Sequence, residues 1–204
     1  TELAAAGTQT AALAFGGDAP ATSPEFYGGT DEYDGSSWTA GGALSTGRKN
    51  LGGAGTQTAA LAFGGYLGPP GFTNVTEEYD GSSWTNGGSL SHDRGNIGNA
   101  GTQTAGLAFG GAPPPRTVTE EYDGTSWTTG TSMTQGRYGM ASAGTQTAAF
   151  GAGGESPTGY TITEEYDGSS WTNGGALSTA RWFIAGGGSL AAGLGSGGYI
   201  AATG

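Results

Sequence analysis

A short motif, Gly-Thr-Gln-Thr-Ala, recurs along the chain and constrains its fold more than any other sequence feature. It begins at Gly7, Gly55, Gly101 and Gly144, and a degraded fifth copy begins at Gly188. A period of roughly 45 residues is typical of propellers and solenoids, in which each repeat is one supersecondary unit. The motif therefore predicts one repeat domain over residues 1–204. Its predicted repeat units are approximately 3–48, 49–94, 95–137, 138–181 and 182–204.

Each repeat is interpreted as four strands, as the second repeat illustrates. Residues 51–58 form a Gly-rich first strand, and residues 59–63 form a second strand with alternating side chains. A variable loop follows, then a third strand over 75–79 and a fourth that begins at 83–85. Between the last two strands, Asp80-Gly81 predicts a type I′ hairpin turn. No segment reads as a helix, so the sequence predicts an all-β fold.

The fifth repeat is incomplete. After Gly197-Gly198 only six residues remain, and they contain neither the Tyr-Asp-Gly hairpin nor the Trp of the other repeats. Two interpretations stay open: five blades with an incomplete last blade, which we favour, or four blades with a C-terminal appendage. The missing strands would be absent or supplied from elsewhere. The start at Thr1 rather than Met predicts a processed product or a fragment of a longer chain.

The order of Gly64-Gly65, Tyr79-Asp80 and Trp84 within the repeat resembles the kelch repeat. One departure is the short spacing from Tyr to Trp. The resemblance implies a kelch-like β-propeller, with blades arranged around a central channel. The near identity of the copies also resembles repetitive kelch-like proteins encoded by marine bacteriophages. That second resemblance implies a component of a virion or phage tail.

The charge of the chain limits its partners. The net charge is -11, with 6 basic against 17 acidic residues. Because such a surface repels phosphate, we expect neither nucleic-acid binding nor attraction to anionic membranes. No apolar run approaches the length of a membrane span, so membrane insertion is not expected. The 45 Gly residues lie at fixed places in the repeat, which favours ordered turns over disorder.

Four arginines occupy one repeat position, between the last strand of a repeat and the first strand of the next: Arg48, Arg94, Arg137 and Arg181. Near the rim of a channel, their guanidinium groups could bind a carboxylate, sulfate or phosphate. The alternative, which we favour, is internal pairing. An acidic pair such as Glu77-Glu78 also recurs in each repeat, and a carboxylate buried on a middle strand needs a donor.

The repeated Tyr and Trp residues are expected to pack between neighbouring blades, although a sugar-stacking platform is the functional alternative. The variable loops carry the other candidate binding residues. Those in the predicted site, beside the four arginines, are Tyr66, Phe72, His92, Tyr138 and Trp182. Further loop residues of interest are Phe26, Tyr27, Arg116 and Tyr160.

No catalytic or metal site emerges from the sequence. There is no Cys, and His92 is the only histidine, so a zinc or copper ligand set is not expected. The Glu-Glu-Tyr-Asp-Gly segment lacks the alternating oxygen ligands of a calcium loop. Ser91, His92 and Asp93 are adjacent in sequence, which does not make a catalytic triad. We expect no cofactor and no enzymatic activity.

Three functions are compared. The favoured hypothesis is an extracellular or virion-associated propeller for attachment or assembly, whose partners are other virion or surface proteins or a host glycan or protein receptor. Assembly could use the incomplete last blade. The alternative is a free lectin-like propeller that binds glycans. A hydrolase or oxidoreductase at the channel mouth is the third, and it has too few titratable candidates.

Overall fold

The computed structural model of the chain describes residues 2–18, 26–69 and 71–200. Within those ranges all regular secondary structure is β-strand, as the sequence predicts. Part of the first variable loop, residues 19–25, lies outside the described residues, as does the C-terminal segment 201–204.

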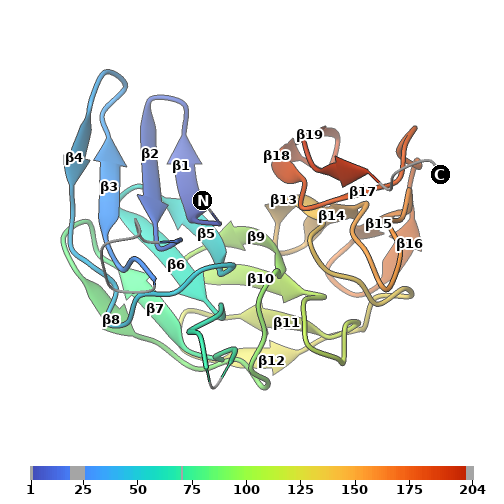
Figure 1. Cartoon of the computed structure of the whole chain (residues 1–204), viewed down its shortest axis with the longest axis horizontal. Helices are drawn as coiled ribbons and strands as arrows, with labels where there is room; N and C mark the ends of the chain where they lie inside the picture. The colour runs from blue at the N-terminus through green and yellow to red at the C-terminus, as the bar shows by residue number, and fades with distance from the viewer. Residues whose placement is uncertain (1, 19–25, 70, 201–204) are drawn as a thin grey trace. The chain divides into compact units, whose positions relative to one another are not determined.

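Four sheets, each of four strands paired in chain order, form the blades of a β-propeller (Figure 1). The first blade comprises β1 (Ala4–Thr8), β2 (Ala11–Phe15), β3 (Thr30–Tyr33) and β4 (Trp38–Ala40). The second comprises β5 (Gly52–Thr56), β6 (Ala59–Phe63), β7 (Thr76–Tyr79) and β8 (Trp84–Asn86). The third comprises β9 (Gly98–Thr102), β10 (Ala105–Phe109), β11 (Thr119–Tyr122) and β12 (Trp127–Thr129). The fourth comprises β13 (Ala141–Thr145), β14 (Ala148–Ala152), β15 (Thr163–Tyr166) and β16 (Trp171–Asn173).

The fifth repeat does not form a blade, so the favoured prediction of five blades is wrong and the alternative of four blades with an appendage is confirmed. Its described strands form two two-stranded sheets. One pairs β18 (Ala185–Ser189) with β19 (Ala192–Ser196), and the other pairs β17 (Arg181–Trp182) with β20 (Tyr199–Ile200). The physical reason is that residues 182–204 do not include a Tyr-Asp-Gly-x-x-Trp segment, from which the outer strands of each complete blade are made.

The repeated motif forms the tight hairpin between the first two strands of each blade. In the second blade, Thr56 pairs with Ala59, so the predicted first strand ends two residues early and Gln57-Thr58 make the turn. Gly55 has a φ of 104°, and a Cβ there would lie 2.2 Å from the Ala59 carbonyl oxygen. A residue with a side chain is therefore excluded by both backbone angle and space.

The second hairpin of each blade differs from the predicted type I′ turn. Tyr79 pairs with Trp84, which leaves a four-residue connection, and only Gly81 in it has a positive φ. A type I′ turn needs positive φ at both central residues. Instead, the Asp80 carboxylate accepts hydrogen bonds from the backbone N–H groups of Ser82 and Ser83 at 2.9 and 2.8 Å. Asp80 thus organises the turn through its side chain.

The chain divides into two compact units. The first contains Thr1–Gly95, Thr102–Gly106 and Tyr122–Trp127, and the second contains Asn96–Gly101, Leu107–Glu121 and Thr128–Gly204. Residues of the third blade therefore belong to both units. The sequence-based expectation of one domain stays a prediction.

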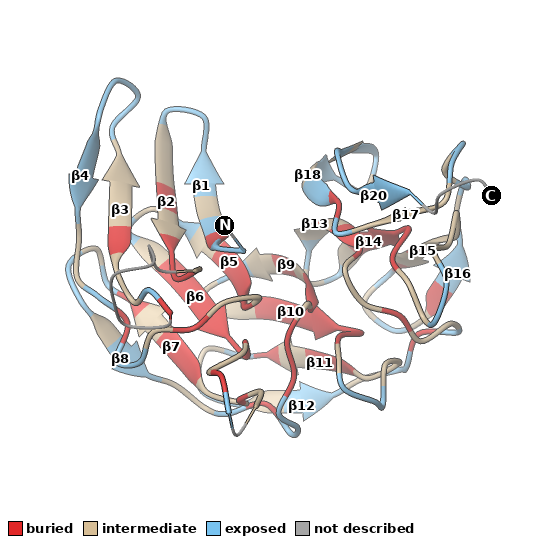
Figure 2. Cartoon of the chain, viewed as in Figure 1, coloured by how far each residue is buried: buried red, intermediate tan, exposed pale blue. Residues whose placement is uncertain are grey.

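The fourth strand of each blade carries mainly exposed residues (Figure 2). The second strands of the second, third and fourth blades are mostly buried, whereas β4 is exposed along its length. In the first unit, Leu13, Phe15 and Tyr79 lie in one apolar cluster. In the second unit, Phe109 and Trp171 lie in another. Both clusters join side chains from successive repeats, so the core is built at the faces between blades.

Candidate functional site

The repeated tyrosines connect successive blades through the second glutamate of the acidic pair. The Tyr79 hydroxyl donates to the Glu32 carboxylate in the first unit, and the Tyr166 hydroxyl donates to Glu121 at 2.6 Å in the second. Tyr122 makes the same contact with Glu78. Burial, together with the adjacent Glu32 carboxylate, raises the pKa of Tyr79 to about 12. These tyrosines are neutral hydrogen-bond donors at physiological pH.

The tryptophans of the second, third and fourth blades pack against the preceding blade, whereas Trp38 of the first blade is exposed. The Trp84 ring lies 4.9 Å from Phe15 between centroids, and its Nε1–H donates to the Thr30 hydroxyl at 2.9 Å. Trp171 repeats this arrangement with Phe109 at 4.8 Å and with Thr119 at 3.0 Å. Each Trp therefore fills an apolar gap and satisfies its polar N–H at the same interface. This placement agrees with packing between blades and leaves no repeated sugar platform at these residues.

The glutamine of the repeated motif also joins blades. Gln57 Nε2 donates to the carbonyl oxygens of Ala12 and Tyr33 at 3.2 and 2.6 Å. Gln103 donates in the same way to Ala60 and Tyr79 at 3.1 and 2.7 Å. In the fifth repeat this position is Leu190, which packs against the apolar cluster of the fourth blade instead.

The arginine position is largely buried. Arg48 is 1% exposed, and its Nη1 lies 2.6 Å from Glu77 Oε1, while the other Glu77 oxygen accepts a hydrogen bond from the Ser45 N–H. Arg137 pairs with Glu164, and its remaining N–H groups reach the carbonyl oxygens of Gly153 and Gly151 at 2.8 Å each. Burial lowers the pKa of both guanidinium groups, but the carboxylate partners oppose that effect.

Of the other two arginines, Arg94 is buried and Arg181 is half-buried. Arg94 and Glu120 are each 1% exposed and occupy the repeat positions of Arg48 and Glu77. Arg181 is half-buried, and its Nη1 donates to the Gly197 carbonyl oxygen at 3.3 Å. Among the described residues, the fifth repeat forms no third strand that would carry a glutamate for Arg181. An external anion could reach Arg48 or Arg137 only by displacing an internal carboxylate.

Five of the predicted loop residues fall into two aromatic clusters, one in each unit. In the first unit, Tyr66 packs edge-on against Phe26 and Phe72, with ring centroids 5.6 and 5.3 Å apart. In the second, the Arg116 guanidinium lies over the Tyr138 ring at 4.9 Å, and Phe183 packs against the same ring at 6.1 Å. Trp182 is half-buried on β17, opposite Tyr199 on β20.

His92 is an exposed loop residue whose Nδ1 lies 2.8 Å from the Ser91 hydroxyl. Among the described residues, no group of three or more His, Asp or Glu side chains could hold a metal ion. None of the described residues forms a helix long and apolar enough to cross a membrane.

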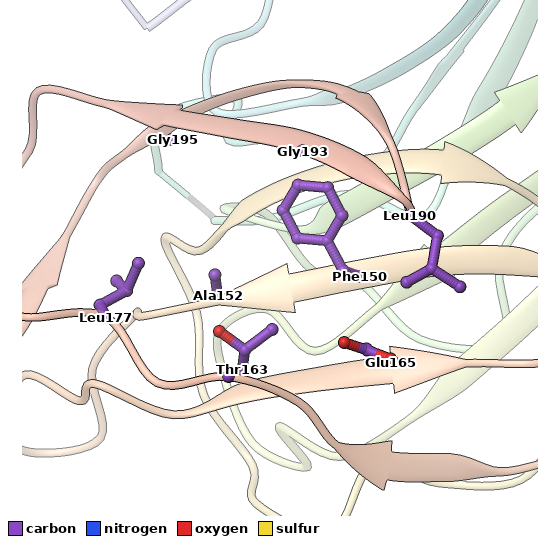
Figure 3. Close-up of a pocket in the computed structure, with 9 residues that line it drawn as sticks. Phe150, Ala152, Thr163, Glu165, Leu177, Leu190, Gly193 and Gly195 are labelled. Atoms are coloured by element: carbon purple, nitrogen blue, oxygen red, sulfur yellow. The ribbon is translucent and has the colours of Figure 1, made fainter.

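A pocket of about 220 Å³ lies where the fourth blade meets the fifth repeat (Figure 3). Thr163 and Glu165 of β15 line it beside Phe150 and Ala152 of β14, and Leu177, Leu190 and β19 complete the lining. Thr163 and Glu165 occupy the repeat positions of Thr119 and Glu121, which accept hydrogen bonds from Trp171 and Tyr166. Sequence reasoning missed this pocket. The available signal was the repetition of the Thr and Glu acceptor positions at Thr163 and Glu165, which no Tyr or Trp of residues 182–204 covers at the equivalent positions.

The fold is that of a solved structure, described as the structure of YjhT. The match has a TM-score of 0.83 at 14% sequence identity, and it covers 98% of this chain and 78% of the other. At that identity the likeness establishes the β-propeller fold alone. No family model matches the chain. No curated protein matches it in sequence.

Proposed function

We propose that the chain is a kelch-like propeller that serves as a non-enzymatic binding or structural module, carried on a virion or a cell surface for attachment or assembly. The Gly-Gly, Tyr-Asp and Trp positions of the repeat support the kelch assignment. The near identity of the copies supports the phage-like setting. Both remain resemblances in sequence.

The observation that carries this proposal is that the repeated Arg, Glu and Tyr side chains are bonded to one another inside the protein. Arg48 and Arg137 are paired with buried glutamates, and Tyr79 and Tyr166 donate to carboxylates of the preceding blade. A hydrolase or oxidoreductase needs titratable groups that converge on a pocket. The pocket between the fourth blade and the fifth repeat has one titratable residue in its lining, Glu165. We therefore assign the repeats to the scaffold and the variable loops to recognition.

The glycan-binding alternative rests on the loop aromatics, since the repeated Tyr and Trp side chains pack between blades. Tyr66, Phe72, Tyr138 and Trp182 are each half-buried. Because the residue type and its place differ from one loop to the next, these aromatic residues do not form equivalent sites on successive blades. Binding of the isolated chain to a broad glycan array would favour this alternative.

The location is tested with an antibody against the chain. Native source material is separated on a density gradient, and intact cells are treated with protease. The proposal predicts that the chain sediments with particles or is removed from the cell surface. Recovery only in the protected cell interior contradicts it. A matched gradient run after disruption of the particles serves as the control.

A further inference from the structure

Arg116 is the one arginine of the chain that lies outside the repeated arginine position. It stands in the variable loop of the third blade, where its carbonyl oxygen accepts a hydrogen bond from the Arg137 backbone N–H at 3.1 Å. In the second blade, the Arg94 N–H donates in the same way to the Thr73 carbonyl oxygen at 3.2 Å. Arg116 thus occupies the repeat position of Thr73, so the fold does not require an arginine there.

The Arg116 guanidinium has no carboxylate partner among the described residues, whereas those of Arg48 and Arg137 are paired with glutamates. Its Nη1 donates to the Ser156 hydroxyl at 2.6 Å, and the group lies over the Tyr138 ring. Its Nε is buried and makes no hydrogen bond to the described part of the chain. A guanidinium carries five N–H donors, so most of them are unused. The unpaired positive charge is therefore available to an external anion.

The Ser156 hydroxyl beside Arg116 belongs to a loop that is held by further hydrogen bonds. The Ser156 carbonyl oxygen accepts from the Tyr160 hydroxyl at 2.7 Å, and that hydroxyl accepts from Gln135 Nε2 at 3.2 Å. Because Ser156 Oγ accepts from Arg116, its own hydrogen can be donated elsewhere. The Ser156 hydroxyl and Arg116 Nη2 are thus neighbouring donors, suited to hold one oxyanion.

The charge around the site favours a ligand with a single negative charge. Arg116 supplies one positive charge, and the Tyr138 hydroxyl is hydrogen-bonded to the Glu155 carboxylate. The chain as a whole has a net charge of -11, so a ligand with several anionic groups is repelled. Ser156, Tyr160 and Gln135 add hydroxyl and amide groups, which suit a ligand rich in hydroxyl groups. A sugar with one anionic group fits this setting better than an acidic peptide.

We propose that Arg116 and Ser156 form a site for a sugar that carries one oxyanion, either a carboxylate or a sulfate ester. The oxyanion accepts hydrogen bonds from Arg116 Nη2 and from the Ser156 hydroxyl, while Tyr138 holds the guanidinium in place. This inference rests on the proposed binding role of the variable loops and gives that role a ligand class. The gradient measures location and does not depend on Arg116, so the two proposals fail separately.

The test titrates the full chain with galacturonate and with galactose that is sulfated on one hydroxyl, and galactose is the neutral control. Binding is followed by NMR up to millimolar sugar at constant ionic strength, because salt screens exposed charges. We expect saturable shifts of the Arg116 Nε–H and Ser156 amide signals with at least one acidic sugar and none with galactose. The acidic sugar that binds more tightly identifies the oxyanion.

Two variants make the result specific to Arg116. Arg116→Thr installs the residue that the second blade has at this position, so the fold should be kept, and the affinity should fall by about tenfold or more because a charge-assisted hydrogen bond is lost. Lys49→Gln removes the same charge from a lysine that is paired with Glu2 and Asp18, and it should leave the affinity unchanged.

Three results overturn the proposal. The first is an absence of saturable shifts with both acidic sugars. The second is binding of an acidic sugar that Arg116→Thr does not weaken. The third is tighter binding of a peptide with one central glutamate than of either sugar, which would assign Arg116 to a protein partner.

Discussion

Tyr79 of the second blade donates its hydroxyl hydrogen bond to Glu32 of the first, across 47 residues of sequence. The Tyr79 side chain is fully buried, and its ring stacks on Trp84 at 4.9 Å between centroids. Trp84 in turn donates to Thr30. One Tyr–Trp pair thus satisfies two acceptors on the preceding blade, which makes the blade interface polar and specific as well as apolar.

Replacing Tyr79 with Phe should destabilise the fold by about 1.5–3 kcal/mol, because a hydrogen bond to a charged acceptor is lost. The Tyr33→Phe variant is the matched control. Tyr33 stacks on Trp38 in the same way, but Trp38 is 53% exposed and no earlier blade in the described residues covers the pair. Urea unfolding should show a much smaller change for Tyr33→Phe. Equal losses would place the stabilisation within the hairpin instead of between blades.

Removing one partner of a buried ion pair should be more costly. Arg137→Met leaves the Glu164 carboxylate buried without its cation, so we expect a loss of about 3–5 kcal/mol. The double variant Arg137→Met with Glu164→Leu should recover most of that loss. Thermal unfolding in the presence and absence of sulfate checks the competing role in anion binding. Stabilisation by sulfate that depends on Arg137 would contradict a purely structural pair.

Two glutamines at the same repeat position, Gln103 and Gln9, provide a matched comparison. Gln103→Leu removes two hydrogen bonds to carbonyl oxygens of the second blade and should cost about 1–3 kcal/mol. Gln9 has the same repeat position but is exposed, so Gln9→Leu should change stability very little. The difference between the two unfolding midpoints is the measurement. A Gln9→Leu variant as unstable as Gln103→Leu would show that the side chain acts within its own hairpin.

The lowered pKa values of the hairpin-turn aspartates predict how the free energy of unfolding depends on pH. Backbone N–H bonds from Ser37, and further bonds from Ser36, lower the pKa of Asp34 to about 2, and Asp80 and Asp167 are lowered alike. An unfolded Asp titrates at about 3.9. Their contribution is therefore complete above about pH 4 and is lost as the pH falls towards 2. Stability differences between the native chain and Asp80→Asn should shrink over that window, and a constant difference would contradict the assignment.

The sequence predicts the local elements well where side-chain alternation and glycine spacing are strong. The strand over 59–63 has the predicted bounds, because Ala and Leu alternate between two turns. The buried pairing of Arg48 and Arg137 with glutamates also follows from the repeat, since one basic and one acidic position recur together. The strand prediction depends on residues within one repeat, whereas the pairing joins neighbouring repeats and was predictable because both positions recur at a fixed spacing.

Contacts between repeats were less accessible to sequence reasoning. Packing between neighbouring blades was predicted for Tyr79 and Trp84, but their acceptors Glu32 and Thr30 on the preceding blade were not. Blade number was also misjudged, because the Gly188 copy resembles the start of a complete repeat. Two strands without the following Tyr-Asp-Gly hairpin cannot form a four-stranded sheet. The pocket beside Glu165 is open because no such hairpin packs against the fourth blade there.

A double-mutant cycle on Glu32 and Tyr79 tests most directly whether the repeated polar residues serve as contacts between blades. The variants are Glu32→Gln, Tyr79→Phe and both together, each unfolded in urea under the same conditions. We predict a coupling free energy of about 1.5–3 kcal/mol, as expected for a hydrogen bond to a carboxylate. Losses that simply add, with coupling near zero, would contradict this account of the blade interface.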